Sequence, residues 1–225
     1  MPDTKKVLYI GGHGKIGLLT TPKLVEKGHE VHSLVRNPDY KAELEGLGAT
    51  PVIADITKQS AADWAQLVDG FDVVVWGAGN GGRGGADLTF AVDQDGAIAL
   101  VEGMESLGEK APRLIMISYM GATTNEVEND GGSWYAYVES KKNADNRINS
   151  SSLDHVILGP GLLTEDPAAG ITVTEPSSVR DGDAKTPREL VADVIAEIIN
   201  EDKVPPHAPL EFYTGDQPVS SIWES

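Results

Sequence analysis

The sequence predicts an α/β fold: a Rossmann-type, doubly wound parallel sheet with helices on both faces, in a single domain that spans residues 1–225. Two observations predict it. Short apolar runs alternate with longer segments of helical spacing, a pattern typical of a parallel sheet covered on both sides. The first run, residues 7–10, ends in a glycine cluster from which a helical pattern starts at once, as in a dinucleotide-binding turn.

Six apolar runs have the length and composition of buried strands: residues 7–10, 30–35, 50–54, 73–76, 113–118 and 155–158. Helical patterns lie between them and after the last: residues 15–27, 39–47, 60–68, 90–107, 135–150 and a segment that begins near Pro187. The ends of these helices carry suitable residues. Gly28 follows the first helix, and Ser60 can cap the N-terminus of the third.

The last part of the chain, about residues 160–225, is expected to add small elements on the substrate side of the same domain. Residues 160–183 are rich in proline, glycine, threonine and aspartate, which predicts irregular structure with one short strand near residues 171–174. Residues 210–214 form another strand-like run, which we expect to be an edge strand or an appendage of the domain.

Composition excludes several classes of function. The net charge of −17 disfavours binding to nucleic acid or to an anionic membrane, and no apolar stretch reaches the roughly 20 residues of a membrane span. There is no cysteine, and the five histidines are scattered without metal-ligand spacing, so we expect no metal site. We expect a cytoplasmic protein, a monomer or homodimer, that acts on a small molecule.

The glycine turn, residues 11–17, reads Gly-Gly-His-Gly-Lys-Ile-Gly and allows two motif registers. Gly12, Gly14 and Gly17 match GxGxxG, whereas Gly11, Gly14 and Gly17 match GxxGxxG. Glycines here permit a tight turn and a close approach of the backbone to a pyrophosphate, and the following helix offers free amides to the anion. The alternative is a structural turn alone. The cofactor contacts predicted from this turn are Gly11, His13, Gly14, Lys15, Ile16 and Gly17.

The residues after the second strand indicate which cofactor is bound. An acidic residue usually follows this strand when the cofactor is NAD, but residues 32–37 contain none. Arg36 stands there instead, and a guanidinium suits the 2′-phosphate of NADP. The sequence therefore favours NADP(H) over NAD(H), although a solvated arginine at a strand end would look the same.

Two further loops at the same edge of the sheet are expected to contact the cofactor. Asp55 and Ile56 follow the third strand and can flank the adenine ring, although Asp55 is equally suited to cap a helical turn. Gly77, Ala78 and Gly79 follow the fourth strand, where small residues let the backbone lie against the cofactor.

Tyr137 and Lys141 form a YxxxK pair on one face of a predicted helix. The lysine charge would lower the phenol pKa, and the tyrosine could donate a proton to a substrate oxygen as hydride arrives. Lys141 can also bind the nicotinamide ribose. Ser118 ends the fifth strand at the same edge and can steady a developing oxyanion. Tyr135 is the competing tyrosine, and an ordinary surface pair is the alternative.

Together these motifs resemble the atypical branch of the short-chain dehydrogenase/reductase superfamily, which holds small NAD(P)H-binding proteins akin to NmrA-like proteins and biliverdin reductase B. Residues 92–104 look like its central helix, 113–122 like its serine-bearing strand, and 153–167 resemble its LDYTIVRPGxLTDDP stretch. The resemblance implies that Pro160, Gly161 and Leu162 lie beside the nicotinamide. Gly159 departs from the family, which usually has arginine there.

The resemblance implies an NADPH-dependent oxidoreductase that transfers hydride to a small carbonyl, quinone or flavin-type acceptor. The alternative is an NADP(H)-binding redox sensor of the NmrA-like type, without turnover. An epimerase that retains its cofactor is a third reading, less favoured for a chain of this length. Residues 79–87, 120–134 and 162–183 are expected to determine the substrate.

Overall fold

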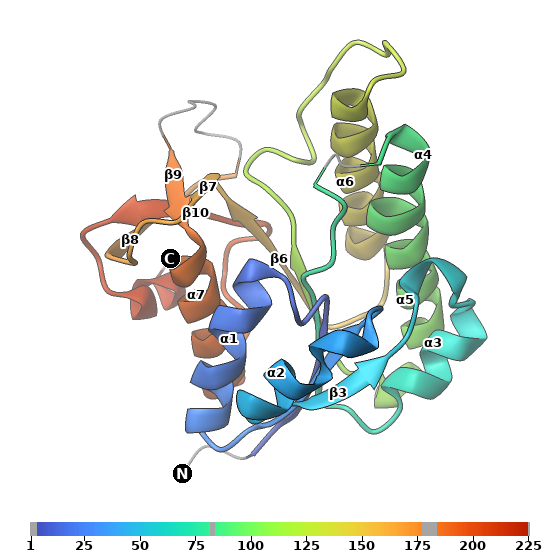
Figure 1. Cartoon of the computed structure of the whole chain (residues 1–225). Helices are drawn as coiled ribbons and strands as arrows, with labels where there is room; N and C mark the ends of the chain where they lie inside the picture. Colours follow the sequence, from blue (N-terminus) through green and yellow to red (C-terminus); the bar gives the residue numbers. More distant parts are fainter. Residues whose placement is uncertain (1–3, 82–83, 177–183, 225) are drawn as a thin grey trace.

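A computed structural model describes residues 4–81, 84–176 and 184–224, and it confirms the predicted fold (Figure 1). One sheet has the strand order β3-β2-β1-β4-β5-β6-β10-β8. The first six strands are parallel, and their order reverses between β1 and β4. The eight strands are β1 (Lys6–Ile10), β2 (Glu30–Val35), β3 (Thr50–Ile53), β4 (Val73–Trp76), β5 (Arg113–Ile117), β6 (His155–Pro160), β8 (Gly170–Thr174) and β10 (Leu210–Gly215).

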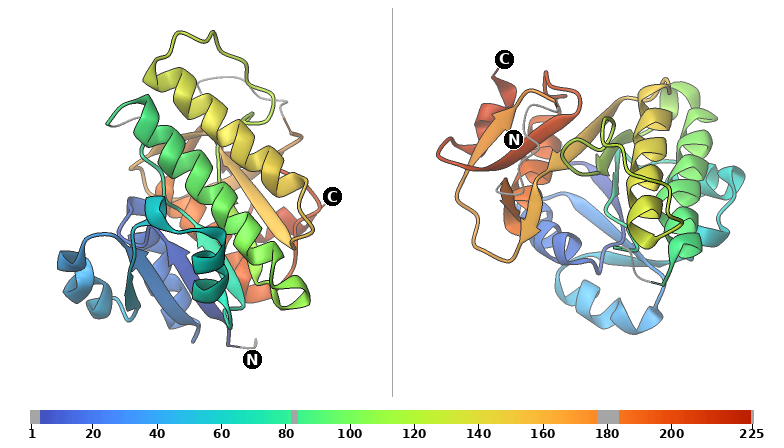
Figure 2. Two further views of the ribbon diagram at one scale, coloured as in Figure 1. Left: turned by 90° about the vertical axis from the view of Figure 1, so that its right-hand side faces the viewer. Right: turned by 90° about the horizontal axis from the view of Figure 1, so that it is seen from above.

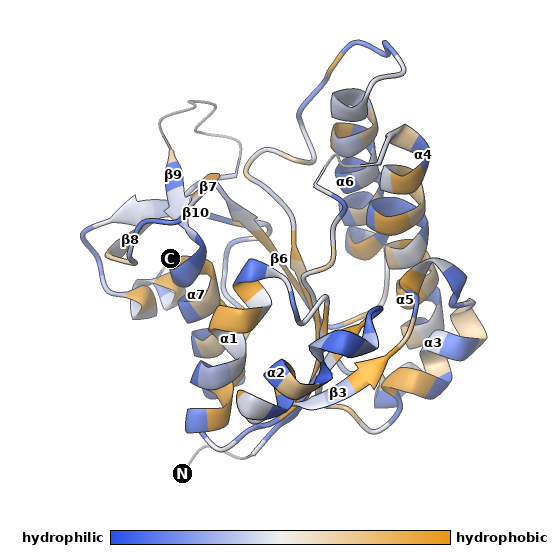
Figure 3. Cartoon of the chain, in the orientation of Figure 1, coloured by the Kyte–Doolittle hydropathy of each residue, from blue (hydrophilic) through white to orange (hydrophobic). Residues whose placement is uncertain are grey.

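Helices cover both faces of the sheet (Figures 1 and 2). On one face α1 (Lys15–Glu26) packs beside α7 (Arg188–Glu201), and on the other lie α3 (Ala61–Val68), α5 (Gly96–Glu105) and α6 (Ser133–Asn149). The short helix α2 (Lys41–Gly46) joins β2 to β3. Polar and apolar residues alternate along these helices, as Figure 3 shows for α1 and α3, because each helix turns only one face to the sheet.

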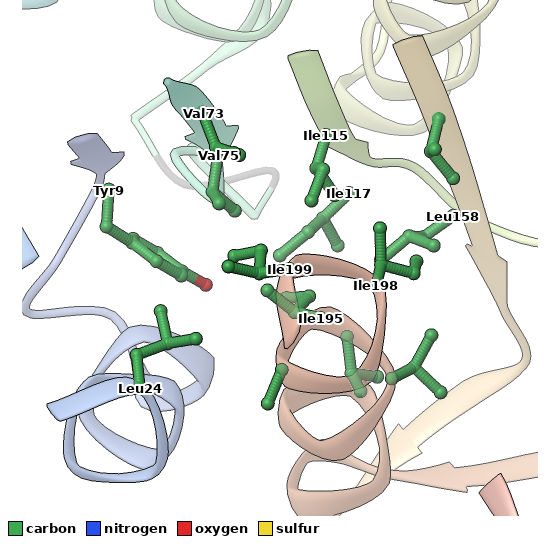
Figure 4. Packing of buried hydrophobic residues seen from close by; sticks show 14 of the residues in the cluster. Tyr9, Leu24, Val73, Val75, Ile115, Ile117, Leu158, Ile195, Ile198 and Ile199 are labelled. Carbon is green, nitrogen blue, oxygen red and sulfur yellow. The ribbon is translucent and has the colours of Figure 1, made fainter. Parts of the chain in front are cut away.

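Alternating residues of each strand enter different cores. Val7 and Tyr9 of β1 belong to the core under α1 and α7, which Figure 4 shows at close range. Leu8 and Ile10 belong to the core under α3, α5 and α6. Strands buried on both faces are therefore apolar at nearly every position, which is why β1, β4 and β5 were predictable from short continuous runs.

The C-terminal part of the chain differs from prediction in two ways. The strand expected as an edge or appendage, β10, lies inside the sheet, parallel to β6 and antiparallel to β8, so β8 forms the edge. Part of the segment expected to be irregular forms a second sheet, in which β7 (Leu162–Thr164) pairs with β9 (Lys185–Pro187). Both strands have only three residues, too few for a recognisable pattern.

The helix expected over residues 90–107 begins earlier and is not uniform. It starts as α4 (Ala86–Thr89), passes through a π-helical segment (Phe90–Asp95) and continues as α5. The π-helical segment turns Asp93 into the interior, where it is 1 % exposed. Within the described ranges, no helix is long and apolar enough to cross a membrane.

Candidate functional site

The glycine turn lies at the point where the strand order reverses. The amides of Gly11 and Gly12 both donate to the Leu34 carbonyl, at 3.0 and 3.1 Å, which holds the turn against the end of β2. Gly11 has φ +83°, and a Cβ there would lie 2.8 Å from the Ala78 nitrogen. A Cβ on Gly12 would lie 2.5 Å from the Ser33 Cβ. The tight approach of this turn to its neighbours therefore requires glycine at both positions.

A cavity of about 470 Å³ opens in front of this turn, and we call it the glycine-turn cavity. It lies at the carboxyl ends of β1, β2, β3 and β4, which is where open α/β sheets bind ligands. Nine of the predicted cofactor contacts line it: Gly11, His13, Gly14, Arg36, Asp55, Ile56, Gly77, Ala78 and Gly79. Residues that the motifs did not indicate also line it, among them Asn37, Tyr40, Thr57, Asn80, Leu88 and Val92.

His13 is held in place at this cavity by two partners. Its ring stacks on Tyr40 with centroids 3.5 Å apart, and its Nε2 lies 2.8 Å from Oε2 of Glu43. Both partners follow β2: Tyr40 directly precedes α2, and Glu43 lies in the first turn of that helix. The sequence placed them in a helix of unassigned function, so their proximity to the glycine turn could be seen only in the fold.

Asp55 has the alternative role that the sequence left open. It is the N-cap of a 3₁₀ turn, and it accepts hydrogen bonds from the Thr57 amide at 3.1 Å and the Thr57 hydroxyl at 2.8 Å. These bonds are the main reason that its pKa lies below the ordinary value, and the nearby charge of Arg36 lowers it further. Arg36 itself is exposed at the end of β2.

Three predicted contacts are engaged elsewhere in the structure. The Lys15 ammonium lies 2.5 Å from Oε1 of Glu165, which also accepts from Arg188 at 2.9 Å. Ile16 packs against the core under α1 and α7. Gly17 lets the first turn of α1 close on the glycine turn, since a Cβ there would lie 2.7 Å from the Gly12 oxygen. Gly17 thus has the packing role of a third motif glycine.

A second cavity, of about 820 Å³, is lined by two of the three predicted catalytic residues but not by Lys141, and we call it the aromatic cavity. Ser118 and Tyr137 both line it. The Tyr137 ring stacks with the rings of Tyr119 and Trp134, whose centroids lie 5.5 and 5.7 Å away. The loop after β4 separates the two cavities, because Gly79 and Asn80 line the first and Gly81 the second. The predicted Pro160, Gly161 and Leu162 also line the aromatic cavity.

Lys141 is buried beneath this site and pairs with a carboxylate that the sequence analysis missed. Its ammonium lies 3.3 Å from Oδ1 of Asp93 and donates to the Ile117 carbonyl at 3.2 Å. Burial alone would lower the lysine pKa, but the Asp93 charge, with Tyr137 and Asp145 nearby, raises it above the ordinary value. Asp93 also accepts from the Asn80 amide at 2.8 Å, so this pair anchors the loop between the cavities.

The expectation that Lys141 lowers the pKa of Tyr137 is wrong for the net effect. The lysine charge does act in that direction, but burial of the phenol acts more strongly and raises the pKa above its ordinary value of 10.0. Tyr137 therefore keeps its proton at neutral pH. The group that faces the aromatic cavity is an acid able to donate that proton.

Ser118 donates its hydroxyl proton to a second buried carboxylate. Its Oγ lies 2.5 Å from Oδ2 of Asp145, which is 1 % exposed. Burial raises the pKa of Asp145 to about 6, against the lowering effects of the Ser118 hydrogen bond and the Lys141 charge. The sequence did contain a signal for this residue, because Asp145 follows Tyr137 and Lys141 at four-residue intervals on one helix face.

At Gly159, the family that this sequence resembles usually has arginine. The glycine of this chain leaves room for a buried side chain. A Cβ on Gly159 would lie 2.8 Å from Cγ of Glu211 in β10. Glu211 is fully buried and accepts from the Gly121 amide at 2.8 Å, which holds the loop that carries Tyr119. Gly161 is also required, since a Cβ there would lie 2.1 Å from the Ala184 oxygen. Glycine at both positions therefore lets the chain pass closely between Glu211 and Ala184 beside the aromatic cavity.

Comparison with known proteins identifies the family. The sequence profile of the NAD(P)H-binding proteins matches residues 11–202, which include the glycine turn and both cavities. The chain belongs to this NAD(P)H-binding family. Membership of this family confirms the expected resemblance to small atypical proteins of the short-chain dehydrogenase/reductase type. It also confirms that the cofactor is a nicotinamide dinucleotide.

Similar proteins match nearly the whole chain. The uncharacterized sugar epimerase YhfK of Bacillus subtilis is 31% identical over 216 residues, which cover 96% of this chain and 97% of that protein. A solved structure from Bacillus halodurans, assigned to the NAD-dependent epimerases/dehydratases, has 30% identity and a TM-score of 0.84, with 98% and 99% of the two chains covered. The anaerobilin reductase ChuY of Escherichia coli shares the fold at 18% identity, with a TM-score of 0.69 and coverage of 94% and 98%.

Proposed function

We propose that this protein is an NADPH-dependent oxidoreductase that transfers hydride to a small conjugated or carbonyl acceptor. One observation carries the proposal: Tyr137, which burial keeps protonated, and Ser118 line one aromatic cavity next to the glycine-turn cavity. Such an arrangement presents a proton donor and a second hydroxyl to an acceptor that lies beside the cofactor.

The glycine-turn cavity fits the adenosine and diphosphate part of the cofactor. Gly11 and Gly14 line the cavity at the start of α1, where the helix dipole and the amides of the first helical turn, which have no partner within the helix, favour an anion. Gly77, Ala78 and Gly79 form a wall of small residues, and the aromatic cavity follows beyond Gly81. When bound, the cofactor supplies a hydride from its nicotinamide ring.

The residues of the aromatic cavity then perform three tasks. Tyr119, Tyr137 and Trp134 offer flat rings to a planar acceptor. Tyr137 donates a proton to the acceptor oxygen as negative charge develops there. Lys141 lies under the site, where its positive charge stabilises the tyrosinate that remains. A flavin or quinone that accepts hydride directly needs Tyr137 less.

Arg36→Ala is expected to weaken NADPH binding by roughly 10- to 100-fold, the contribution of hydrogen bonds to a charged group. Arg36 lies at the rim of the glycine-turn cavity, where Asp55 is the one acidic side chain among the described lining residues. The affinity for NADH should stay the same, because NADH lacks the 2′-phosphate. Calorimetric titration with both cofactors tests this, and an equal loss for both would show that Arg36 does not bind that phosphate.

Three functions are separated by one set of assays. NADPH oxidation is followed spectroscopically with a panel of quinones, flavins and aldehydes, and turnover with any of them supports the oxidoreductase. Tight cofactor binding with no turnover of any acceptor in the panel indicates a redox sensor. The name of YhfK suggests an epimerase, for which cofactor should remain bound through purification and NADPH should not be consumed.

A further inference from the structure

The hydrogen bond between Ser118 and Asp145 points away from the aromatic cavity. Ser118 directly follows β5, is 6 % exposed and lines that cavity, yet its Oγ donates to Oδ2 of Asp145. The other oxygen of Asp145, Oδ1, is buried and accepts no hydrogen bond from the residues that the structure describes. A serine hydroxyl has one proton, so in this arrangement Ser118 can offer only lone pairs to a ligand.

Protonation of Asp145 reverses this bond. A neutral carboxyl group carries its own O–H, which can donate to the Ser118 oxygen. The serine proton is then free to point into the aromatic cavity. Only in this second arrangement can Ser118 stabilise negative charge on an acceptor oxygen, because an oxyanion needs a donor.

We infer that Asp145 is a positioning residue whose proton sets the direction of the Ser118 hydrogen bond, and thereby admits or disfavours carbonyl acceptors. The inference rests on the proposed reduction. Tyr137 still gives the proton that the acceptor oxygen gains, and solvent returns it. Asp145 keeps its own proton throughout, so the hydride and proton balance of the reaction is unchanged.

The surroundings of Asp145 place this change near neutral pH. Burial raises the pKa of Asp145 to about 6, with Lys141 as the facing positive charge on the same helix. Tyr137, also on α6, and Tyr119, after β5, face it as neutral phenols. Ionised Asp145, with Ser118 turned away, is therefore the main form at pH 8, and the protonated form is substantial at pH 6.

Other charged groups near this part of α6 already have partners. Asp93, in the π-helical segment packed on α6, pairs with Lys141. Glu105 of α5 pairs with Arg147 of α6, which lowers the Glu105 pKa and removes it from the neutral range. Asp145 is thus the carboxyl group next to Ser118 that titrates between pH 5 and 8.

The pH profile of kcat/KM with NADPH and 4-nitrobenzaldehyde, whose carbonyl oxygen gains negative charge and then a proton, tests the inference. For the wild type we expect a fall of about tenfold or more between pH 6 and pH 8, levelling at the activity of Ser118→Ala. Asp145→Asn should remove this fall, because its amide donates to Ser118 at every pH. The exposed Asp95→Asn is the matched control and should keep the wild-type profile.

A fall that persists in Asp145→Asn would overturn the inference and leave the proposed reduction intact. If Asp145→Asn does not fold, the pH profile of Ser118→Ala tests the inference instead. The fall in kcat/KM between pH 6 and pH 8 must also disappear when the serine hydroxyl is absent. If 4-nitrobenzaldehyde is not reduced at all, the proposed function fails for this acceptor, and its binding is measured instead. The affinity for this aldehyde in the presence of NADP⁺, measured by tryptophan quenching, should then weaken from pH 6 to pH 8, and a constant affinity would overturn the inference.

Discussion

Lys141→Met is expected to lower the free energy of unfolding by about 3–5 kcal/mol, the cost of leaving one member of a buried ion pair without its partner. Asp93 is 1 % exposed and Lys141 5 % exposed, so water cannot replace the lost charge. The Asp93 carboxylate would then lie in the interior without a compensating charge, which opposes folding.

A double-mutant cycle, measured by urea unfolding, checks this. Asp93→Asn combined with Lys141→Met removes both charges and should recover a large part of the stability that Lys141→Met loses. The double variant should also lose affinity for NADPH, because Lys141 no longer lies beneath the site. If Lys141→Met unfolds like the wild type, or the double variant recovers nothing, the pair does not stabilise the fold in this way.

Tyr137→Phe is expected to lower kcat for an aldehyde or ketone about 10²- to 10⁴-fold, the usual contribution of a positioned general acid. The aromatic ring at position 137 remains, so its stacking with Tyr119 and Trp134 should persist. Both the fold and the affinity for NADPH should therefore be unchanged. For a flavin, which can accept hydride directly, the loss should be only a few-fold. The difference between acceptors thus reports whether the phenol proton is used.

Steady-state kinetics with NADPH and each acceptor class measures this effect. Tyr135→Phe is the matched control, because it removes the same hydroxyl from the same helix at a residue that does not line the aromatic cavity described. Its kcat should equal that of the wild type. An equal loss of kcat in the two variants, or no loss of kcat for Tyr137→Phe with any carbonyl acceptor, would show that Tyr137 does not act as the proton donor.

The sheet was predictable because its central strands are buried on both faces. Residues in β1, β4 and β5 are apolar at nearly every position, and each run ends at a turn. The short strands β7 and β9 and the interior place of β10 were not predictable, because they depend on pairing between segments far apart in the chain. Such pairing leaves no local pattern.

The candidate site was predictable where a motif fixes the backbone. The glycine turn, Arg36, Ser118 and Tyr137 lie at the cavities that the topology predicts. The buried acids Asp93 and Asp145 were not predicted, because an aspartate on a helix is ordinarily exposed and composition gives no reason to bury it. Their burial depends on the π-helical segment and on the partners Lys141 and Ser118.

The most direct test of the central claim is a calorimetric titration of the protein with NADPH. We expect one saturable site per chain, and affinity reduced by roughly tenfold or more in Gly14→Val, whose side chain would enter the glycine-turn cavity. Gly46→Ala, a glycine with open space around it, is the matched control and should bind like the wild type. The absence of saturable heat with both NADPH and NADH, or undiminished binding by Gly14→Val, would contradict cofactor binding at this turn.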